Sequence, residues 1–442
     1  MPIIKLHIAL FCTLLYLTTG CNSQDRTAIE KEDTTPGQDD PRARIARMYE
    51  PKVTIDAAMM ARYAFINYDS NRLEYGGEAT PLKKMIDKWR RVVTTGEGEI
   101  NIVHIGASHV QAGVFPNSLR RRILQTFPDR VGGRGLIFPY SAAKRCNNPL
   151  DYSVRCKESM TLDRCVFAQK RTRLGASGIA VTTTGVATDI AIALNDNDIK
   201  YGTTKVELIG GWYPREGGDG RTGMPEMPAV LQYEEAVEQF ELAIPSNSRW
   251  DYTLRGLLLS GPEGGISLHS IGVNGASVGS YLRCPYFCED MKKIKPDIVI
   301  FGLGINDASG VTFDTAYFHR KYIALADSIK KVNPEVAFIY ITNNDCRFMS
   351  HSGNRPNPNG KLAREVFYRL AKETQGAVWD LFSIMGGYRS IDRWREAGLA
   401  KKDCVHFTNE GYTLLGELLA QALLKEIFEA ETGETAGNRN SK

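Results

Sequence analysis

The sequence predicts an α/β protein: a parallel sheet covered by helices on both faces, with an inserted β-sandwich. Of the 442 residues, 43% are hydrophobic and 24% are charged, which is the composition of a soluble globular protein. Near-continuous apolar strands alternate with helical segments, and this pattern is typical of a parallel sheet buried on both faces. Residues 150–262 interrupt the alternation with short strands. These observations exclude a disordered, collagenous or multi-span membrane protein.

The α/β pattern occupies two stretches of the chain. In the first stretch, residues 55–149, apolar periodicity predicts helices over 55–67 and 80–94. The apolar run 99–106 predicts a strand that ends in a glycine turn, and a helix follows over 115–126. In the second stretch, residues 263–432, the same reasoning predicts strands over 266–271, 296–304, 336–342 and 377–381 and helices over 313–332, 361–374 and 409–430.

The interruption between these stretches has the character of an all-β domain. Its apolar runs are short and are separated by Gly, Asn and Asp residues, which favour turns. They predict strands over 178–184, 189–194, 205–210, 229–233, 239–244 and 252–259. Short strands without a long helix between them predict a β-sandwich. Residues 433–442 are expected to form a disordered tail.

The N-terminus has the pattern of an export signal. Lys5 precedes a short apolar stretch, and small residues then lead to Cys21. A cysteine at this point resembles a bacterial lipobox, which implies that residues 1–20 are removed and that Cys21 carries a lipid. The expected location is the bacterial cell envelope, on a membrane surface. The alternative is an ordinary signal peptide with an incidental cysteine.

The segment that follows, residues 21–54, is polar and poor in apolar residues, so it predicts a disordered tether or a simple spacer. The charges of the whole chain nearly cancel, with 55 basic and 51 acidic residues. This balance gives no electrostatic reason to expect a nucleic-acid partner. Seven cysteines remain after Cys12 and Cys21, none of them spaced like a zinc knuckle with histidine partners, and an odd number requires one free thiol or an intermolecular bond.

Four short segments carry candidate chemistry, and the first is Gly106-Ala107-Ser108-His109. It follows the predicted strand 99–106, and ligands of open α/β sheets lie beyond the carboxyl ends of strands. Ser108 is therefore a candidate nucleophile. The structural alternative is that Ser108 only caps the next helix.

Two further segments offer hydrogen-bond donors. Gly275, in the loop after the run 266–271, allows a backbone N–H to approach a ligand closely. Asn306 directly follows the strand 296–304, where its amide could donate to a developing oxyanion. Each residue alone is equally well explained by ordinary turn chemistry.

The fourth segment is Asp403-Cys404-Val405-His406, just before the last predicted helix. A carboxylate and an imidazole three residues apart can lie side by side at such a turn. Asp403 would then accept a hydrogen bond from one ring nitrogen of His406 and leave the other as a base. Thr408 is expected to cap the last helix.

The four segments occur in the order Ser, Gly, Asn and Asp-x-x-His, and in this order they resemble the four blocks of the SGNH (GDSL-type) hydrolase family. The resemblance implies a flavodoxin-like three-layer fold with Ser108 as nucleophile, His406 as base and Asp403 as its orienter. It further implies an oxyanion hole made by the Ser108 and Gly275 amides and the Asn306 side chain, with no metal or cofactor. The usual first block is Gly-Asp-Ser, whereas here Ala107 replaces the aspartate.

The position of the insert, between the Ser and Gly blocks, resembles the two-domain peptidoglycan O-acetylesterases, in which the insert is similar to a carbohydrate-binding module. The resemblance implies a monomeric esterase that removes acetyl groups from peptidoglycan or another glycan through an acyl-serine. A glycan O-acetyltransferase with the same triad and a non-catalytic glycan-binding surface lipoprotein remain alternatives.

Several other polar and aromatic side chains have two interpretations each. His109 is expected either to contact substrate or to pack in the interior. Asn343, Asn344 and Asp345 follow a predicted strand and are expected to line the pocket rim or to form a polar turn. His104 is expected to be structural, and His269 and His319 are expected to be structural or exposed. Residues expected either to stack on a sugar or to pack internally are Trp212 and Tyr213.

Overall fold

The computed structural model describes residues 40–50, 56–143, 149–169, 173–196, 198–215, 223–348 and 355–428. The predicted signal peptide, Cys21 and the C-terminal tail lie outside the described residues. No helix in the described part of the chain is both long and apolar enough to traverse a lipid bilayer.

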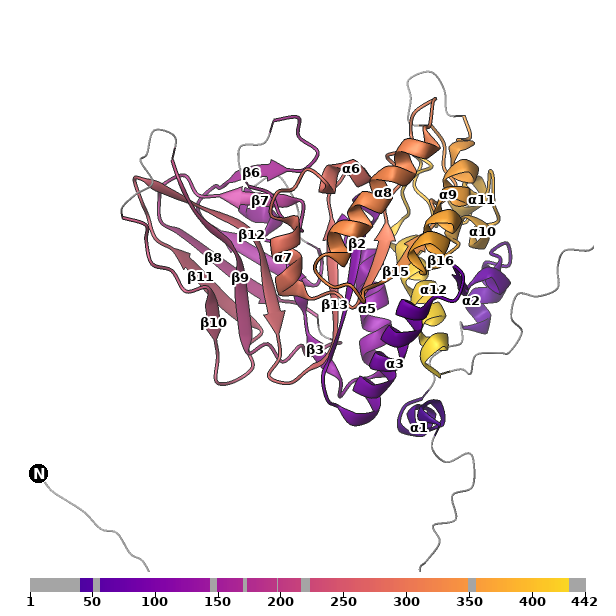
Figure 1. Ribbon diagram of the computed structural model, residues 1–442, viewed down its shortest axis with the longest axis horizontal. Helices are drawn as coiled ribbons and strands as arrows, with labels where there is room; N and C mark the ends of the chain where they lie inside the picture. Colours follow the sequence, from indigo (N-terminus) through magenta and orange to yellow (C-terminus); the bar gives the residue numbers. More distant parts are fainter. Residues whose placement is uncertain are drawn as a thin grey trace, which may run out of the picture. The chain divides into compact units, whose positions relative to one another are not determined.

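The main sheet has seven strands in the order β1-β16-β15-β14-β2-β13-β3 (Figure 1). Their bounds are β1 (Leu73–Tyr75), β2 (Glu99–Gly106), β3 (Val131–Gly133), β13 (Gly265–Gly272), β14 (Ile298–Gly302), β15 (Ala337–Ile341) and β16 (Ala377–Trp379). All neighbours pair in parallel except β1, which adds an antiparallel edge to β16. The predicted parallel sheet is confirmed, and the short edge strand β1 is an addition that the sequence did not reveal.

Helices cover both faces of this sheet. Side chains of β14 alternate between the two sides: Ile298 and Ile300 join one core, whereas Val299 and Phe301 join the other. The first core is completed by α3 (Thr80–Thr95), α5 (Val114–Thr126) and α12 (Asn409–Phe428). The second is completed by α7 (Phe287–Ile294), α8 (Thr315–Lys330) and α9 (Asn359–Thr374). Burial on both faces explains why these strands read as continuous apolar runs.

Short helices occupy the connections between the larger elements. They are α2 (Ala57–Arg62), η1 (Tyr68–Ser70), α4 (Ser108–Gln111), η2 (Tyr140–Ala143), α6 (Val278–Tyr281), α10 (Leu381–Ile384) and α11 (Ile391–Glu396). The helix predicted over 55–67 is therefore only α2, because Tyr63 leaves helical geometry.

The predicted tether, residues 21–54, requires a correction at its C-terminal end. Residues Pro41–Met48 form helix α1, which Asp40 caps by accepting from the amide of Arg42. Ile45 is fully buried, and the Tyr49 hydroxyl donates to Asp129 at 2.8 Å. Two apolar side chains in a polar segment are thus enough to dock this helix on the folded body.

The insert forms two antiparallel sheets, as expected for a β-sandwich. One has the order β10-β9-β12-β7-β6 and the other β11-β8-β5. The strands are β5 (Tyr152–Cys156), β6 (Thr161–Arg164), β7 (Ile179–Thr182), β8 (Thr188–Leu194), β9 (Lys205–Pro214), β10 (Val230–Gln232), β11 (Gln239–Ile244) and β12 (Trp250–Ser260). Buried and exposed residues alternate along β11, so one face of its sheet is apolar.

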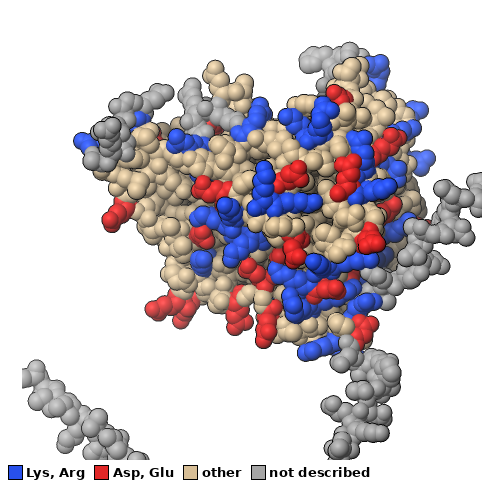
Figure 2. All heavy atoms as spheres, viewed as in Figure 1, with Lys and Arg blue, Asp and Glu red and all other residues tan. Residues whose placement is uncertain are grey.

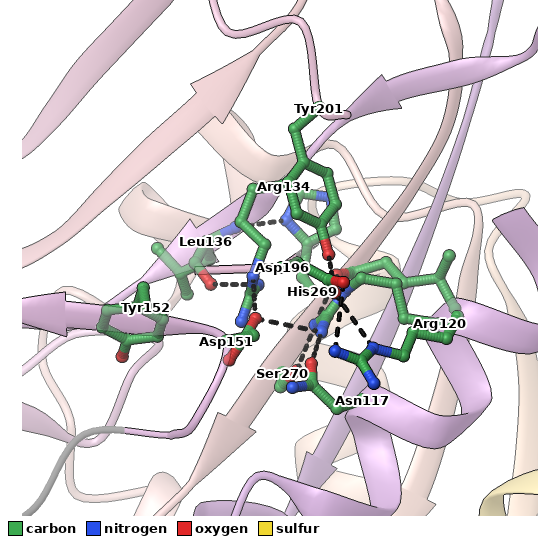
Figure 3. A network of polar contacts seen from close by, with 12 residues as sticks. Asn117, Arg120, Arg134, Leu136, Asp151, Tyr152, Asp196, Tyr201, His269 and Ser270 are labelled. Atoms are coloured by element: carbon green, nitrogen blue, oxygen red, sulfur yellow. Dashed lines mark hydrogen bonds and ion pairs between the residues drawn. The ribbon is translucent and has the colours of Figure 1, made fainter. Parts of the chain in front are cut away.

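The two parts of the fold share structure at their junction. Strand β4 (Gly135–Ile137) precedes residue 150 but pairs with β12 of the insert. A buried ionic network lies beside this pairing (Figure 3). Asp151, at the start of the insert, pairs with Arg134 and lies 3.6 Å from Arg120 of α5. Arg120 also donates to Ser270 of β13 at 2.7 Å. The junction is therefore a packed interface between the two parts.

Acidic and basic side chains are interspersed over the face of the molecule drawn in Figure 2. Many charged side chains of the described residues form ion pairs, as in Lys84–Glu335 at 3.0 Å. This face accordingly shows the mixed surface that the nearly balanced composition predicts.

Candidate active site

The three strands that carry the first three segments lie side by side at the centre of the sheet. Strand β2 pairs with β13 on one side and with β14 on the other. Gly106, Gly272 and Gly302 stand in register at their carboxyl ends. The order β13-β2-β14-β15-β16 is flavodoxin-like: starting from β2, the chain first adds β13 on one side and then adds β14, β15 and β16 on the other. The loops after these strands must therefore meet at one edge of the sheet.

Ser108 begins the short helix α4 immediately after β2. The preceding residue, Ala107, is 2% exposed, and its carbonyl accepts from the amides of Val110 at 3.2 Å and Gln111 at 2.9 Å. Backbone hydrogen bonds thus hold the turn that presents Ser108, although the family's usual aspartate is missing at position 107.

Ser108, His406 and Asp403 form a hydrogen-bonded row. The Ser108 Oγ lies 2.9 Å from His406 Nε2, and His406 Nδ1 lies 2.8 Å from Asp403 Oδ2. These side chains come from segments almost 300 residues apart in the chain, which the structure brings together at the edge of the sheet. The row has the nucleophile, base and orienter geometry of an acyl-transfer site.

The loop that carries Asp403 and His406 is fixed by its own backbone. Asp403 Oδ1 accepts from the amides of Val405 at 3.0 Å and His406 at 2.9 Å. Burial raises the pKa of the Asp403 carboxyl, but these amides and the His406 ring outweigh it and hold the pKa below its usual value. The carboxylate is therefore ionised beside His406 at neutral pH. Thr408 caps α12 as expected, accepting from Gly411 at 3.2 Å.

The remaining two segments follow β13 and β14, the two neighbours of β2 in the sheet. Gly275 has φ +81°, and a Cβ built there would meet nothing within 4 Å, so its amide stands in an open loop. The Asn306 amide donates to the Ala276 carbonyl at 2.9 Å, which ties the Asn306 loop to the Gly275 loop. Beside them, burial raises the pKa of Asp307 to about 6, although the Val278 amide opposes this shift.

The triad is open to solvent. The His406 side chain is 28% exposed and the Asp403 side chain is 42% exposed. An accessible base and orienter allow a bulky substrate to approach Ser108 from outside.

The polar residues after β15 do not line the rim of the site. Asn343, Asn344 and Asp345 are at most 6% exposed. Asn344 donates to the Val405 carbonyl at 3.1 Å, and Asp345 accepts from the Ile391 amide at 3.0 Å. They form a buried polar turn that supports the Asp403–His406 loop.

The other histidines have structural surroundings. His104 is 2% exposed and packs edge-on against Phe115, with ring centroids 5.1 Å apart. His269 accepts from the Leu136 amide at 3.1 Å, and His319 pairs with Glu373 at 2.8 Å. His109 is directed into the interior, where its Nδ1 lies 2.8 Å from the Tyr412 hydroxyl.

The two aromatic residues of the insert that were candidates for sugar stacking are engaged within the protein. Trp212 packs against Tyr252, with ring centroids 5.2 Å apart. The Tyr213 hydroxyl accepts from Arg255 at 2.9 Å. Both contacts are those of internal packing.

Tyr412 is a residue near the site whose role the sequence did not indicate. Tyr412 is an ordinary apolar-face residue of a helix, and its link to His109 depends on how α12 packs. In the part of the chain that the structure covers, no group of three or more His, Cys, Asp or Glu residues is placed to hold a metal ion.

Comparison with known proteins agrees with this architecture. Residues 245–414 match the model of the GDSL-like Lipase/Acylhydrolase family, a range that includes Gly275, Asn306, Asp403 and His406 but not Ser108. The assignment of Ser108 therefore rests on its distance to His406. A search of curated proteins finds no match to this sequence.

Solved structures resemble the chain over different lengths. A peptidoglycan O-acetylesterase is similar over 81% of this chain and 99% of its own, with a TM-score of 0.63 and 21% identity. An acetyl xylan esterase is similar over 36% of this chain and 81% of its own, with a TM-score of 0.29 and 20% identity. A GDSL-like lipase from Bacteroides thetaiotaomicron covers 36% of this chain and 76% of its own, with a TM-score of 0.28 and 19% identity. Residues 245–414 are therefore similar to the GDSL-like Lipase/Acylhydrolase family, and the chain as a whole shares the fold of the peptidoglycan O-acetylesterase structure.

Proposed function

We propose that this protein is a serine esterase that removes O-acetyl groups from a glycan. The observation that carries the proposal is the row Ser108–His406–Asp403, with hydrogen-bond distances of 2.9 and 2.8 Å. A hydroxyl aligned with an imidazole, which is in turn aligned with a carboxylate, is suited to attack on an ester carbonyl.

The reaction follows from these positions. Ser108 Oγ attacks the acetyl carbonyl carbon while His406 Nε2 takes the hydroxyl proton. The carbonyl oxygen becomes an oxyanion, which the amides of Ser108 and Gly275 and the Asn306 side chain would stabilise. His406 then returns the proton to the departing sugar oxygen, and acetyl-Ser108 remains. Water, deprotonated by His406, attacks the carbonyl carbon of this ester; the bond to Ser108 Oγ breaks, acetate leaves, and His406 returns the proton to Ser108 Oγ.

Two observations support a glycan as the substrate. The triad is open at the surface, which suits a polymer better than a lipid chain that requires a deep apolar channel. The chain also shares its fold, over 81% of its length, with a protein named as a peptidoglycan O-acetylesterase. Peptidoglycan is accordingly the first candidate substrate.

The experiment is acetate release from O-acetylated peptidoglycan and from acetylated xylan, with wild type and Ser108→Ala compared. We expect release by the wild type without any added sugar acceptor, and a loss of at least about a thousandfold in the variant, since the nucleophile is absent. Acetate transfer only when an acceptor is added would identify an acetyltransferase instead. A folded wild type that neither releases acetate nor is labelled at Ser108 by a fluorophosphonate would identify a binding protein.

We also propose that Cys21 carries a lipid that anchors the enzyme at the cell envelope. The support is the sequence pattern that ends at Cys21. In a bacterial host, Cys21→Ala is expected to move the protein from the membrane fraction to the soluble exported fraction. An unchanged membrane fraction would contradict the anchor without affecting the esterase proposal.

A further inference from the structure

His109 follows the nucleophile in sequence but is directed away from solvent, behind the catalytic base. Its ring lies 5.4 Å from the ring of His406, between centroids, at an interplanar angle of 55°. The same ring contacts Phe407 at 5.8 Å and Tyr412 at 5.7 Å. His109 thus forms part of an aromatic wall on the interior side of His406.

The hydroxyl of Tyr412 holds His109 in this place. The His109 Nδ1 lies 2.8 Å from that hydroxyl, which belongs to α12. Asn344 lines the same cavity as His109, and its side chain donates to the Val405 carbonyl, next to His406, at 3.1 Å. The ring of His109 is therefore fixed by the helix that follows the loop carrying the base.

The surroundings keep His109 uncharged. Burial lowers the pKa of His109 to about 3, the neighbouring His406 acts in the same direction, and Asn344 and Asp403 oppose them. Burial also raises the pKa of Tyr412, so its hydroxyl stays protonated. A neutral neighbour matters here because a cation at position 109 would disfavour the imidazolium that His406 must become during the reaction.

A cavity next to the His109 ring makes the contact between His109 and His406 important. A cavity of about 30 Å³ lies on the interior side and is lined in part by His109, His104 and Asn343. Without the His109 ring, the wall behind His406 would open towards this cavity. The His406 ring would then gain freedom to rotate away from Ser108.

We propose that His109 is a positioning residue for the general base, a ring held by Tyr412 that packs against His406 and keeps His406 Nε2 aligned with Ser108. The proposal rests on the proposed function, because it needs Ser108 and His406 to be nucleophile and base. It gives a role of its own to His109, the residue that directly follows the nucleophile in the first segment.

The test measures Ser108 activation directly, by the rate of labelling with a fluorophosphonate, together with the hydrolysis of 4-nitrophenyl acetate as a function of pH. The variants are His109→Ala and Tyr412→Phe, the second of which preserves volume and removes only the hydroxyl. The control is His269→Ala, which deletes a buried imidazole on the neighbouring strand β13, away from the triad. Thermal unfolding of each variant shows whether it is folded.

For His109→Ala we expect labelling and kcat to fall about 10- to 100-fold, with KM within about twofold of wild type, because misalignment affects the chemical step. The acid limb of the pH profile should move to higher pH, since water can then hydrate the His406 imidazolium. Tyr412→Phe should change the labelling rate and the pH profile in the same direction but to a smaller extent. His269→Ala should lower thermal stability and leave the labelling rate and the pH profile unchanged.

The outcomes separate the two proposals. A wild type that the fluorophosphonate does not label overturns the proposed function. A labelled wild type with folded His109→Ala at the wild-type rate and pH profile overturns the positioning role. If His109→Ala does not fold, Tyr412→Phe decides, and an unchanged rate and profile in that variant also overturn the positioning role. A loss of labelling rate in His269→Ala equal to that in His109→Ala would attribute the effect to general destabilisation and would also overturn the positioning role.

Discussion

At the scale of single residues, the candidate site depends on a few atoms whose protonation is set by their immediate neighbours. Asp403 is kept ionised by two backbone amides as well as by His406. Asp307, one residue after Asn306, has the opposite environment, because burial favours its neutral form. Two carboxyl groups at one site thus have pKa values displaced in opposite directions.

Asp403→Asn tests the orienting role. The amide has nearly the same shape, but its NH₂ group cannot accept from His406 Nδ1, so the ring is expected to present its proton to Ser108. We expect kcat on 4-nitrophenyl acetate to fall about 10³- to 10⁴-fold with the fold intact. A loss below tenfold in a folded variant would show that His406 does not need Asp403.

Asp307→Asn tests the buried carboxyl through stability. In the native state the pKa of Asp307 is about 6, above its ordinary value of 3.8, so the folded protein holds a proton between these pH values that the unfolded chain has lost. Stability should therefore fall as pH rises from about 4 to 6, by up to about 3 kcal/mol for this group. Urea unfolding of wild type and Asp307→Asn at pH 4 and pH 7.5 measures the difference, and parallel behaviour of the two proteins would contradict it.

At the scale of elements, the site depends on how closely helices approach the sheet and one another. Helix α12 carries Tyr412 and packs on α5, the helix that follows the Ser108 segment. At their closest approach stands Gly416, where a Cβ would lie 2.4 Å from the Cβ of Ser118 and 2.8 Å from the amide nitrogen of Leu119. Because glycine has no side chain, the two helices can pack closely at this position, and α12 can then carry Tyr412 to His109.

Gly416→Ala is accordingly expected to destabilise the protein by about 1–3 kcal/mol, because the backbone of α5 cannot yield to the new methyl group. Gly279→Ala in α6 is the matched control, since its Cβ would come no closer than 3.8 Å to the Ser277 Oγ. The control should be neutral or slightly stabilising. Chemical denaturation of the two variants measures the contrast, and equal effects would show that the α5–α12 contact is not tight.

At the scale of the whole molecule, the inserted sandwich and the α/β part share one buried ionic junction. Burial raises the pKa of Asp151, but the charges of Arg134 and Arg120 outweigh it and hold the pKa below its usual value. All three side chains are at most 3% exposed. Since Asp151 belongs to the start of the insert and Arg120 to α5, we expect both parts to unfold together.

Asp151→Asn tests this coupling. Two buried guanidinium groups would lose their carboxylate, so we expect a loss of about 3–5 kcal/mol at pH 7 and separate unfolding transitions for the two parts. In the wild type the contribution of Asp151 is present above its unfolded pKa and is lost as the pH falls through the lower folded value. The control Glu238→Gln removes the exposed pair with Lys200 and should change stability by less than about 1 kcal/mol. A loss no larger than that of the control would contradict the coupling.

The sequence by itself determined the long strands and helices of the α/β part, the order of the four segments and the residue types of the site. Apolar runs buried on both faces have a distinctive pattern, so β2, β14 and β15 were predictable within one or two residues. Ser108, Gly275, Asn306, Asp403 and His406 were named because each stands where a strand or helix changes to a loop.

Only the tertiary structure decided what lies behind and between these residues. The direction of His109, the burial of Asn343 to Asp345, the edge strand β1 and the docking of α1 depend on contacts between segments far apart in the chain. Local sequence fixes backbone preference and polarity over a few residues, whereas the side on which a given polar group is buried depends on packing across the whole sheet.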